Sequence, residues 1–258
     1  MNSNIGEQAT RAGGSQSTAE RGPGERTRIL VWDLPVRVFH WLLAICFAGA
    51  YVTSGSERWR DVHASLGYTV GVLIAFRLLW AVVGTRYARL ASFAYGPRAV
   101  LAYLRSLLTR NPRHYVGHNP AGSWAIYAIV TLGITTVAAG YATYNHIGGK
   151  WLEEFHQVAG NAMLAVVIGH VAGVVVSSVL HRENLPKAML TGYKSGHPGE
   201  AIRGSRWVTA ALLAGFVAAF WTGTVHLPGL SPTLSLKSAA TGRGPSDDER
   251  RESRERGS

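Results

Sequence analysis

Cysteine is nearly absent from this 258-residue chain, which has only Cys46. A single cysteine excludes an intrachain disulfide, a four-cysteine iron–sulfur cluster and the two-cysteine motif that attaches haem covalently. Cys46 stands between Ile45 and Phe47 in an apolar run, so we expect it to pack as a small apolar side chain. Any redox cofactor must therefore be held without a bond to cysteine.

Acidic residues are also scarce, with 15 Asp and Glu against 26 Lys and Arg, which gives a net charge of +11. Such a balance can indicate nucleic-acid binding. Here, however, the basic residues follow the apolar segments and form no single patch with interleaved aromatics. We therefore expect no nucleic-acid partner. The first thirty residues lack the ordered regions of a cleavable signal peptide, so the first apolar segment is expected to direct insertion.

The apolar residues, 47% of the chain, are gathered into blocks of about 20 residues, the length that crosses a hydrocarbon core. The five blocks are 36–54, 62–84, 123–143, 158–180 and 207–227. They predict an all-α integral membrane protein with four spans at 31–200 and a fifth transmembrane helix at 201–230. The polar ends, 1–30 and 231–258, lack the apolar residues to form a core and are predicted to be disordered.

The charges between the blocks predict the orientation in the membrane. The second and third blocks are separated by arginines without any acidic residue: Arg86, Arg89, Arg98, Arg105, Arg110 and Arg113. A second basic group follows the fourth block: Arg182, Lys187, Lys194, Arg203 and Arg206. Basic residues in the other two loops are balanced by acids. Because cytoplasmic loops are enriched in Lys and Arg, we expect a cytoplasmic N-terminus.

Four histidines fall at two matched depths. His156 and His170 are fourteen residues apart, which places them on nearly one helix face and roughly 21 Å apart along the axis. His63 begins the second block at the outer level, and His40 lies near the inner start of the first. The predicted pairs are His63 with His156 and His40 with His170. Each pair suits the two axial positions of one haem iron, a ligation typical of electron transfer; the alternative is hydrogen bonding between helices.

Arg77 is the one charged residue inside the second block, fourteen residues after His63 and so at the inner level. It is a candidate partner for a haem propionate, with Arg37 a weaker one, and the alternative is snorkelling to lipid phosphate. Three glycines either admit a flat macrocycle or pack helices: Gly67, Gly71 and Gly160. Six further histidines are expected to be solvated or interfacial: His114, His118, His146, His181, His197 and His226.

Over residues 31–194 the chain resembles the bacterial cytochrome b561 and nickel-hydrogenase-type cytochrome b subunits. Three runs carry the resemblance. The first begins with VWDLPVR at residue 31 and continues through His40 and Trp41, the second is HASLG at 63–67, and the third is HRENL at 181–185 followed by AMLTG at 188–192. The spacing of His156 and His170 is the fourth shared feature. It implies a four-helix bundle in the bacterial inner membrane that holds two noncovalent haems b at His40, His63, His156 and His170. It also implies electron transfer between a quinone pool and a redox partner such as a c-type cytochrome or a hydrogenase or dehydrogenase subunit.

Two features depart from the compact four-span members: the fifth apolar block and the charged tail after it. The stretch 97–110 is predicted either to lie as an amphipathic helix on the cytoplasmic leaflet or to pack on the bundle. Two other functions remain open. One is a membrane anchor subunit of a hydrogenase or dehydrogenase complex with one or no haem, and the other is a transporter with a histidine proton relay, which should show broken helices or acidic residues inside the spans.

Overall fold

The structure, a computed structural model, describes residues 26–109 and 113–225. Helices dominate it, with one small sheet. The described elements are, in chain order, β1 (Thr27–Leu30), α1 (Leu34–Thr53), η1 (Glu57–Trp59), α2 (Arg60–Val83), η2 (Leu90–Phe93), α3 (Pro97–Leu108), α4 (Pro120–Tyr144), α5 (Lys150–Leu180), α6 (Leu185–Thr191), β2 (Tyr193–Gly196), η3 (Pro198–Glu200) and α7 (Trp207–Trp221).

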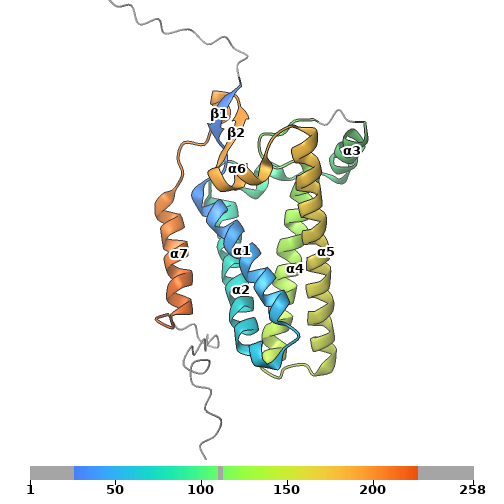
Figure 1. Ribbon diagram of the computed structural model, residues 1–258, viewed down its shortest axis with the longest axis vertical. Helices are drawn as coiled ribbons and strands as arrows, with labels where there is room; N and C mark the ends of the chain where they lie inside the picture. The colour runs from blue at the N-terminus through green and yellow to red at the C-terminus, as the bar shows by residue number, and fades with distance from the viewer. Residues whose placement is uncertain (1–25, 110–112, 226–258) are drawn as a thin grey trace, which may run out of the picture.

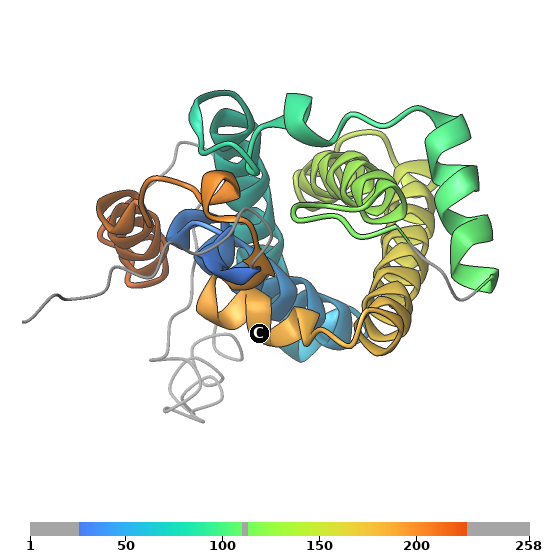
Figure 2. The ribbon, with the colours of Figure 1, turned by 90° about the horizontal axis from the view of Figure 1, so that it is seen from above.

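Four helices, α1, α2, α4 and α5, are long and apolar enough to cross a membrane. They run up and down beside one another (Figure 1). Seen from above, α1 and α2 form one side of the bundle and α4 and α5 the other (Figure 2). The predicted all-α membrane bundle is confirmed. The helix boundaries agree within a few residues, except that α5 begins at Lys150 rather than at 158.

The outward surface of α5 is apolar, as a helix in contact with lipid requires. Its exposed side chains include Val158 (64% exposed), Ile168 (60%) and Val179 (71%). In water so large an apolar face would be a liability. The surface therefore agrees with the membrane location inferred from helix length.

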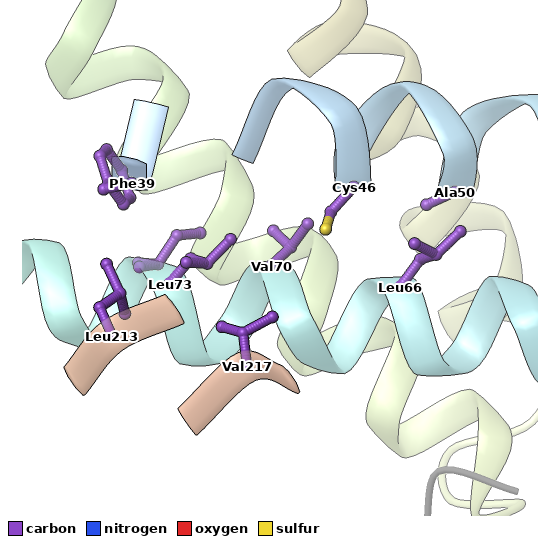
Figure 3. Packing of buried hydrophobic residues seen from close by; sticks show 9 residues of the cluster. Phe39, Cys46, Ala50, Leu66, Val70, Leu73, Leu213 and Val217 are labelled. Carbon is purple, nitrogen blue, oxygen red and sulfur yellow. The ribbon is translucent and has the colours of Figure 1, made fainter. Parts of the chain in front are cut away.

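The apolar core of the α1, α2 and α7 side is drawn in Figure 3, where side chains from the three helices meet. Leu73 of α2 is fully buried there, with Phe39 and Cys46 of α1 and with Leu213 and Val217 of α7. Cys46 is thus a packing residue, as predicted. The same side of the bundle is held to α4 at Gly71, where a Cβ atom would lie 2.9 Å from Val137.

Helix α7 is shorter than the predicted block 207–227, because it ends at Trp221. At about 1.5 Å per residue its 15 residues span roughly 22 Å, less than the ~30 Å of a hydrocarbon core. It runs alongside α1 rather than across the end of the bundle (Figure 1). The indole Nε1 of Trp221 donates to Thr69 Oγ1 of α2 at 2.9 Å. His226 and the predicted tail 231–258 lie outside the described residues.

A two-stranded antiparallel sheet closes the end of the bundle at which α1 begins, which we call the inner end, with Thr27 opposite Gly196 and Leu30 opposite Tyr193. The prediction that disorder extends to residue 30 is therefore wrong for 27–30. Strand β1 is ordered because its backbone groups pair with β2, more than 160 residues later in the chain. Local composition carries no sign of such a partner. Residues 1–25 lie outside the described part.

Asp33 joins the start of α1 to the end of α2. Its side chain is 1% exposed. One carboxylate oxygen accepts from the backbone N–H of Val36 at 2.9 Å and caps α1. The other accepts from Trp80 Nε1 at 3.1 Å and from Thr85 Oγ1 at 2.6 Å. One buried carboxylate thus fixes the angle at which two membrane helices meet at the inner surface.

Asp33→Ala should lower the free energy of unfolding by about 2–4 kcal/mol, because it removes a helix cap and leaves two buried donors without an acceptor. Thermal unfolding followed by circular dichroism in detergent measures the change. Asp61→Ala is the matched control, since Asp61 is exposed in the first turn of α2 and its loss should cost less than about 1 kcal/mol. Equal shifts for both variants would contradict the assigned role of Asp33.

Candidate functional site

At the outer end of the bundle, His63 of α2 and His156 of α5 lie close together in an edge-to-face arrangement. Their ring centroids are 6.0 Å apart, and their planes are nearly perpendicular, at 87°. The two residues are 93 positions apart in the chain. The pairing of His63 with His156, predicted from depth alone, is therefore present as a spatial juxtaposition.

Each of these rings is oriented by a backbone carbonyl. His63 Nδ1 lies 2.8 Å from Ala50 O, and His156 Nδ1 lies 2.9 Å from Thr136 O. A carbonyl oxygen only accepts, so each Nδ1 carries the hydrogen and donates it. In this tautomer Nε2 keeps its lone pair, as a histidine that ligates a metal requires.

Gly140 leaves space for the His156 ring, and a hydrogen bond between Tyr51 and Asn161 joins α1 to α5 nearby. A Cβ atom on Gly140 of α4 would lie 2.7 Å from Cε1 of the His156 ring, so only glycine fits beside that imidazole. Tyr51 of α1 donates to Asn161 Oδ1 of α5 at 2.9 Å, five residues beyond His156. Two of the glycines identified from the sequence do not contact the histidine rings. A Cβ atom on Gly67 would meet nothing within 4 Å, and one on Gly160 would lie 3.9 Å from Thr136.

The inner level holds His40 of α1 and His170 of α5. His40 packs against Trp41, with ring centroids 5.2 Å apart, and its buried Nδ1 has no hydrogen-bond partner among the described residues. His63 and His156 thus lie close together in space, whereas the pairing of His40 with His170 stays a prediction.

Arg77 points into the protein rather than toward lipid. It is 5% exposed, and its Nη1 donates to Ala88 O at 2.9 Å. The guanidinium carbon lies 5.8 Å from the centre of the Phe93 ring. The snorkelling alternative is therefore wrong, because a buried guanidinium cannot reach lipid phosphate. Arg37, the weaker candidate, donates to Leu190 O at the end of α6.

His118 is a site residue that the sequence analysis missed. Its ring lies between Trp32 (4.6 Å) and Phe93 (4.7 Å), and its buried Nδ1 has no partner among the described residues. Burial, reinforced by the nearby Arg77, lowers the pKa of His118 to about 3, so the ring is neutral at pH 7. Its half-buried position differs from the predicted solvated or interfacial one, because aromatic residues from two other segments cover this loop. The local sequence gives one indication that His118 is held in place: the next residue, Asn119, is the N-cap of α4.

The arrangement suits a haem better than a bare metal ion. Within the described ranges no group of three or more His, Cys, Asp or Glu side chains could hold a metal. The four histidines instead stand in two pairs. A haem iron needs only two ligands from the protein, because the porphyrin supplies the others. The outer imidazoles meet that requirement, because the bond from each Nδ1 to a carbonyl leaves the Nε2 lone pair free. The buried Nδ1 atoms of His40 and His118 have no partner among the described residues.

Comparison with known proteins identifies the family. The profile of prokaryotic cytochrome b561 matches residues 31–192. Among curated relatives are proteins named as probable Ni/Fe-hydrogenase B-type cytochrome subunits. The protein of Rhodobacter capsulatus is 24% identical over 66% of this chain and 82% of its own length, and a namesake from Escherichia coli K12 is 25% identical over 64% and 90%. No solved structure matches. The chain belongs to the prokaryotic cytochrome b561 family of membrane proteins that bind b-type haem and transfer electrons.

Proposed function

We propose that the chain is a di-haem b-type cytochrome that carries electrons between a quinone pool and a partner redox protein in a respiratory chain. The single observation that carries the proposal is the His63–His156 pair, with rings 6.0 Å apart and each Nδ1 bonded to a backbone carbonyl. His40 and His170 form the second ligand pair at the inner level.

Electron transfer suits this ligand set better than chemistry at the metal. A haem held by two imidazoles has no vacant axial position and changes only the oxidation state of its iron. Helix α5 supplies one ligand to each pair, and the fourteen residues between them correspond to roughly 21 Å along the helix. The two haems would therefore lie one above the other, near opposite surfaces of the membrane.

Other residues hold the cofactors rather than react. We assign to Arg77 the role of a propionate partner at the inner haem, since one of its nitrogens is bonded to Ala88 and the guanidinium offers further N–H groups. Gly140 keeps the space that the His156 ring occupies. The backbone carbonyls of Ala50 and Thr136 fix the ligand tautomer at the outer level.

The names of the relatives support a hydrogenase as the redox partner, and a dehydrogenase subunit or c-type cytochrome is the alternative. The arginine-rich loops support a cytoplasmic N-terminus under the positive-inside rule. We further propose that α7, apolar on all sides, lies within the membrane beside α1 as a fifth helix. The protein would then exchange electrons with quinone within the bilayer, and the redox partner would dock at a membrane surface.

A haem-poor anchor subunit is the second candidate, and the hydrogenase names of the relatives favour it equally. The paired, preoriented imidazoles argue for the cytochrome, because an anchor has no need of them. The transporter is the weakest alternative. It calls for interrupted helices, whereas α1, α2, α4 and α5 are each continuous.

A pyridine haemochrome assay on the purified, haem-supplied protein should give two b haems per chain. His63→Leu and His156→Leu should each remove one haem, because a single remaining imidazole leaves an open axial position. His40→Leu and His170→Leu should remove the other. His146→Asn is the control, since His146 is exposed and Asn tolerates its left-handed backbone. Full haem content in the four Leu variants would exclude these ligands, and no haem in a well-folded protein would favour the anchor.

Gly140→Ala should selectively weaken haem binding at the outer site, because the new Cβ would lie 2.7 Å from the His156 ring and force it to turn. We expect about half of the total haem to be lost or to bind with a shifted midpoint potential, measured by redox titration. Gly173→Ala on α5 is the control, since nothing lies within 4 Å of its added Cβ. An unchanged titration curve for Gly140→Ala would contradict the assignment.

A further inference from the structure

Helix α3 is not one of the four membrane helices, but it contacts two of them, α4 and α5. It lies beyond α4 and α5 at the end of the bundle that also carries the β-sheet (Figures 1 and 2). Its buried residue, Tyr103, is 2% exposed, and the Tyr103 hydroxyl is 3.3 Å from Ser177 Oγ of α5. One face of α3 is therefore packed on the bundle.

The opposite face of α3 combines apolar and cationic side chains. Leu101, Leu104 and Leu108 are 49%, 44% and 85% exposed. Arg105 is also exposed and lies four residues after Leu101 and three before Leu108, which places it on the same face. Leucines flanked by arginine are typical of helices that lie in a membrane interface, where the cation reaches the lipid phosphates.

A hollow of about 290 Å³ borders this face, and although Ala99 and Ala102 make part of its wall apolar, we call it the polar hollow after its charged and hydroxyl-bearing side chains. Arg105 and Arg113 line it, together with the hydroxyl-bearing Ser106, Thr109 and Tyr115. The sequence has no acidic residue between Asp61 and Glu153 that would neutralise these arginines. Glu183, which follows α5, is already paired with Lys194 at 3.4 Å. The hollow is therefore suited to an anion, and guanidinium groups bind phosphate in a bidentate manner.

A larger apolar hollow of about 740 Å³ lies along the outer face of α4. It is lined by Trp124, Ala128 and Leu132, which are four residues apart and so follow the helix axis. Tyr95 also lines it, and the Tyr95 ring is 5.7 Å from the ring of Tyr115 in the polar hollow. The cationic and apolar hollows are thus neighbours, the first at the membrane surface and the second along a membrane helix.

We propose that the two hollows together bind one anionic phospholipid, with its phosphate at Arg105 and Arg113 and an acyl chain along α4. A free phosphate would use only the polar hollow, whereas a lipid matches both. Basic pockets beside membrane helices are a recognised form of lipid-headgroup site. Because α3 contacts both α4 and α5, the bound lipid braces the helix that carries His156 and His170.

Native mass spectrometry tests the proposal on the haem-loaded full chain in mild detergent, titrated with phosphatidylglycerol. The unchanged protein should bind one lipid molecule. Arg105→Gln/Arg113→Gln should bind it at least about tenfold more weakly, since each arginine supplies charge-assisted hydrogen bonds. Arg58→Gln/Arg60→Gln, which removes the same charge at the opposite end of the bundle, should bind normally. Haem content and circular dichroism verify the fold of each variant.

A second variant separates the acyl-chain site from the charge. Thr131→Phe fills the apolar hollow that Thr131 lines and should weaken lipid binding with both arginines intact. Three results would overturn the proposal: unchanged affinity in the double arginine variant, displacement of the lipid by millimolar inorganic phosphate, or retention of an isoprenoid quinone in place of phospholipid. Equal affinity for phosphatidylcholine would also exclude an anionic-lipid site.

Discussion

The rest of the structure depends on one constraint: α5 must present two imidazoles, fourteen residues apart, to partners on two different helices. Inside a membrane no water is available, so a polar side chain must find its hydrogen-bond partner within the protein. A backbone carbonyl that accepts this bond also fixes the orientation of the side chain. Ala50 and Thr136 provide such carbonyls, on either side of the outer pair. Gly140 then leaves the space that the His156 ring needs. The orientation of the His63 and His156 rings is thus set by helix packing.

The two ends of the bundle are stabilised in different ways. At the inner end, Asp33 ties the start of α1 to α2 and the β1–β2 sheet joins segments from both ends of the described chain. Arg77 is buried and His118 is half-buried beneath these elements. At the outer end the polar contacts are fewer, and Tyr51–Asn161 links α1 to α5 directly.

Much of this architecture was predictable because membrane helices leave a strong signal in sequence. Runs of about 20 apolar residues locate α1, α2, α4 and α5, and the depth of each histidine predicts the pairs. The failures concern contacts between segments distant in the chain. Strand β1 needs β2, and His118 is buried by Trp32 and Phe93, so neither position is evident from its own neighbours. Arg77 could not be assigned to the interior or to lipid until its contact with Ala88 was known.

The most direct test of the central claim is electron paramagnetic resonance of the oxidised protein, because the ferric signal depends on the angle between the two axial imidazole planes. The rings of His63 and His156 are close to perpendicular, at 87°. We therefore predict a low-spin signal of the strongly anisotropic type that nearly perpendicular imidazoles produce, and its loss in His63→Leu. A spectrum containing only high-spin iron, or only the rhombic signal of parallel imidazoles, would contradict the proposed ligation.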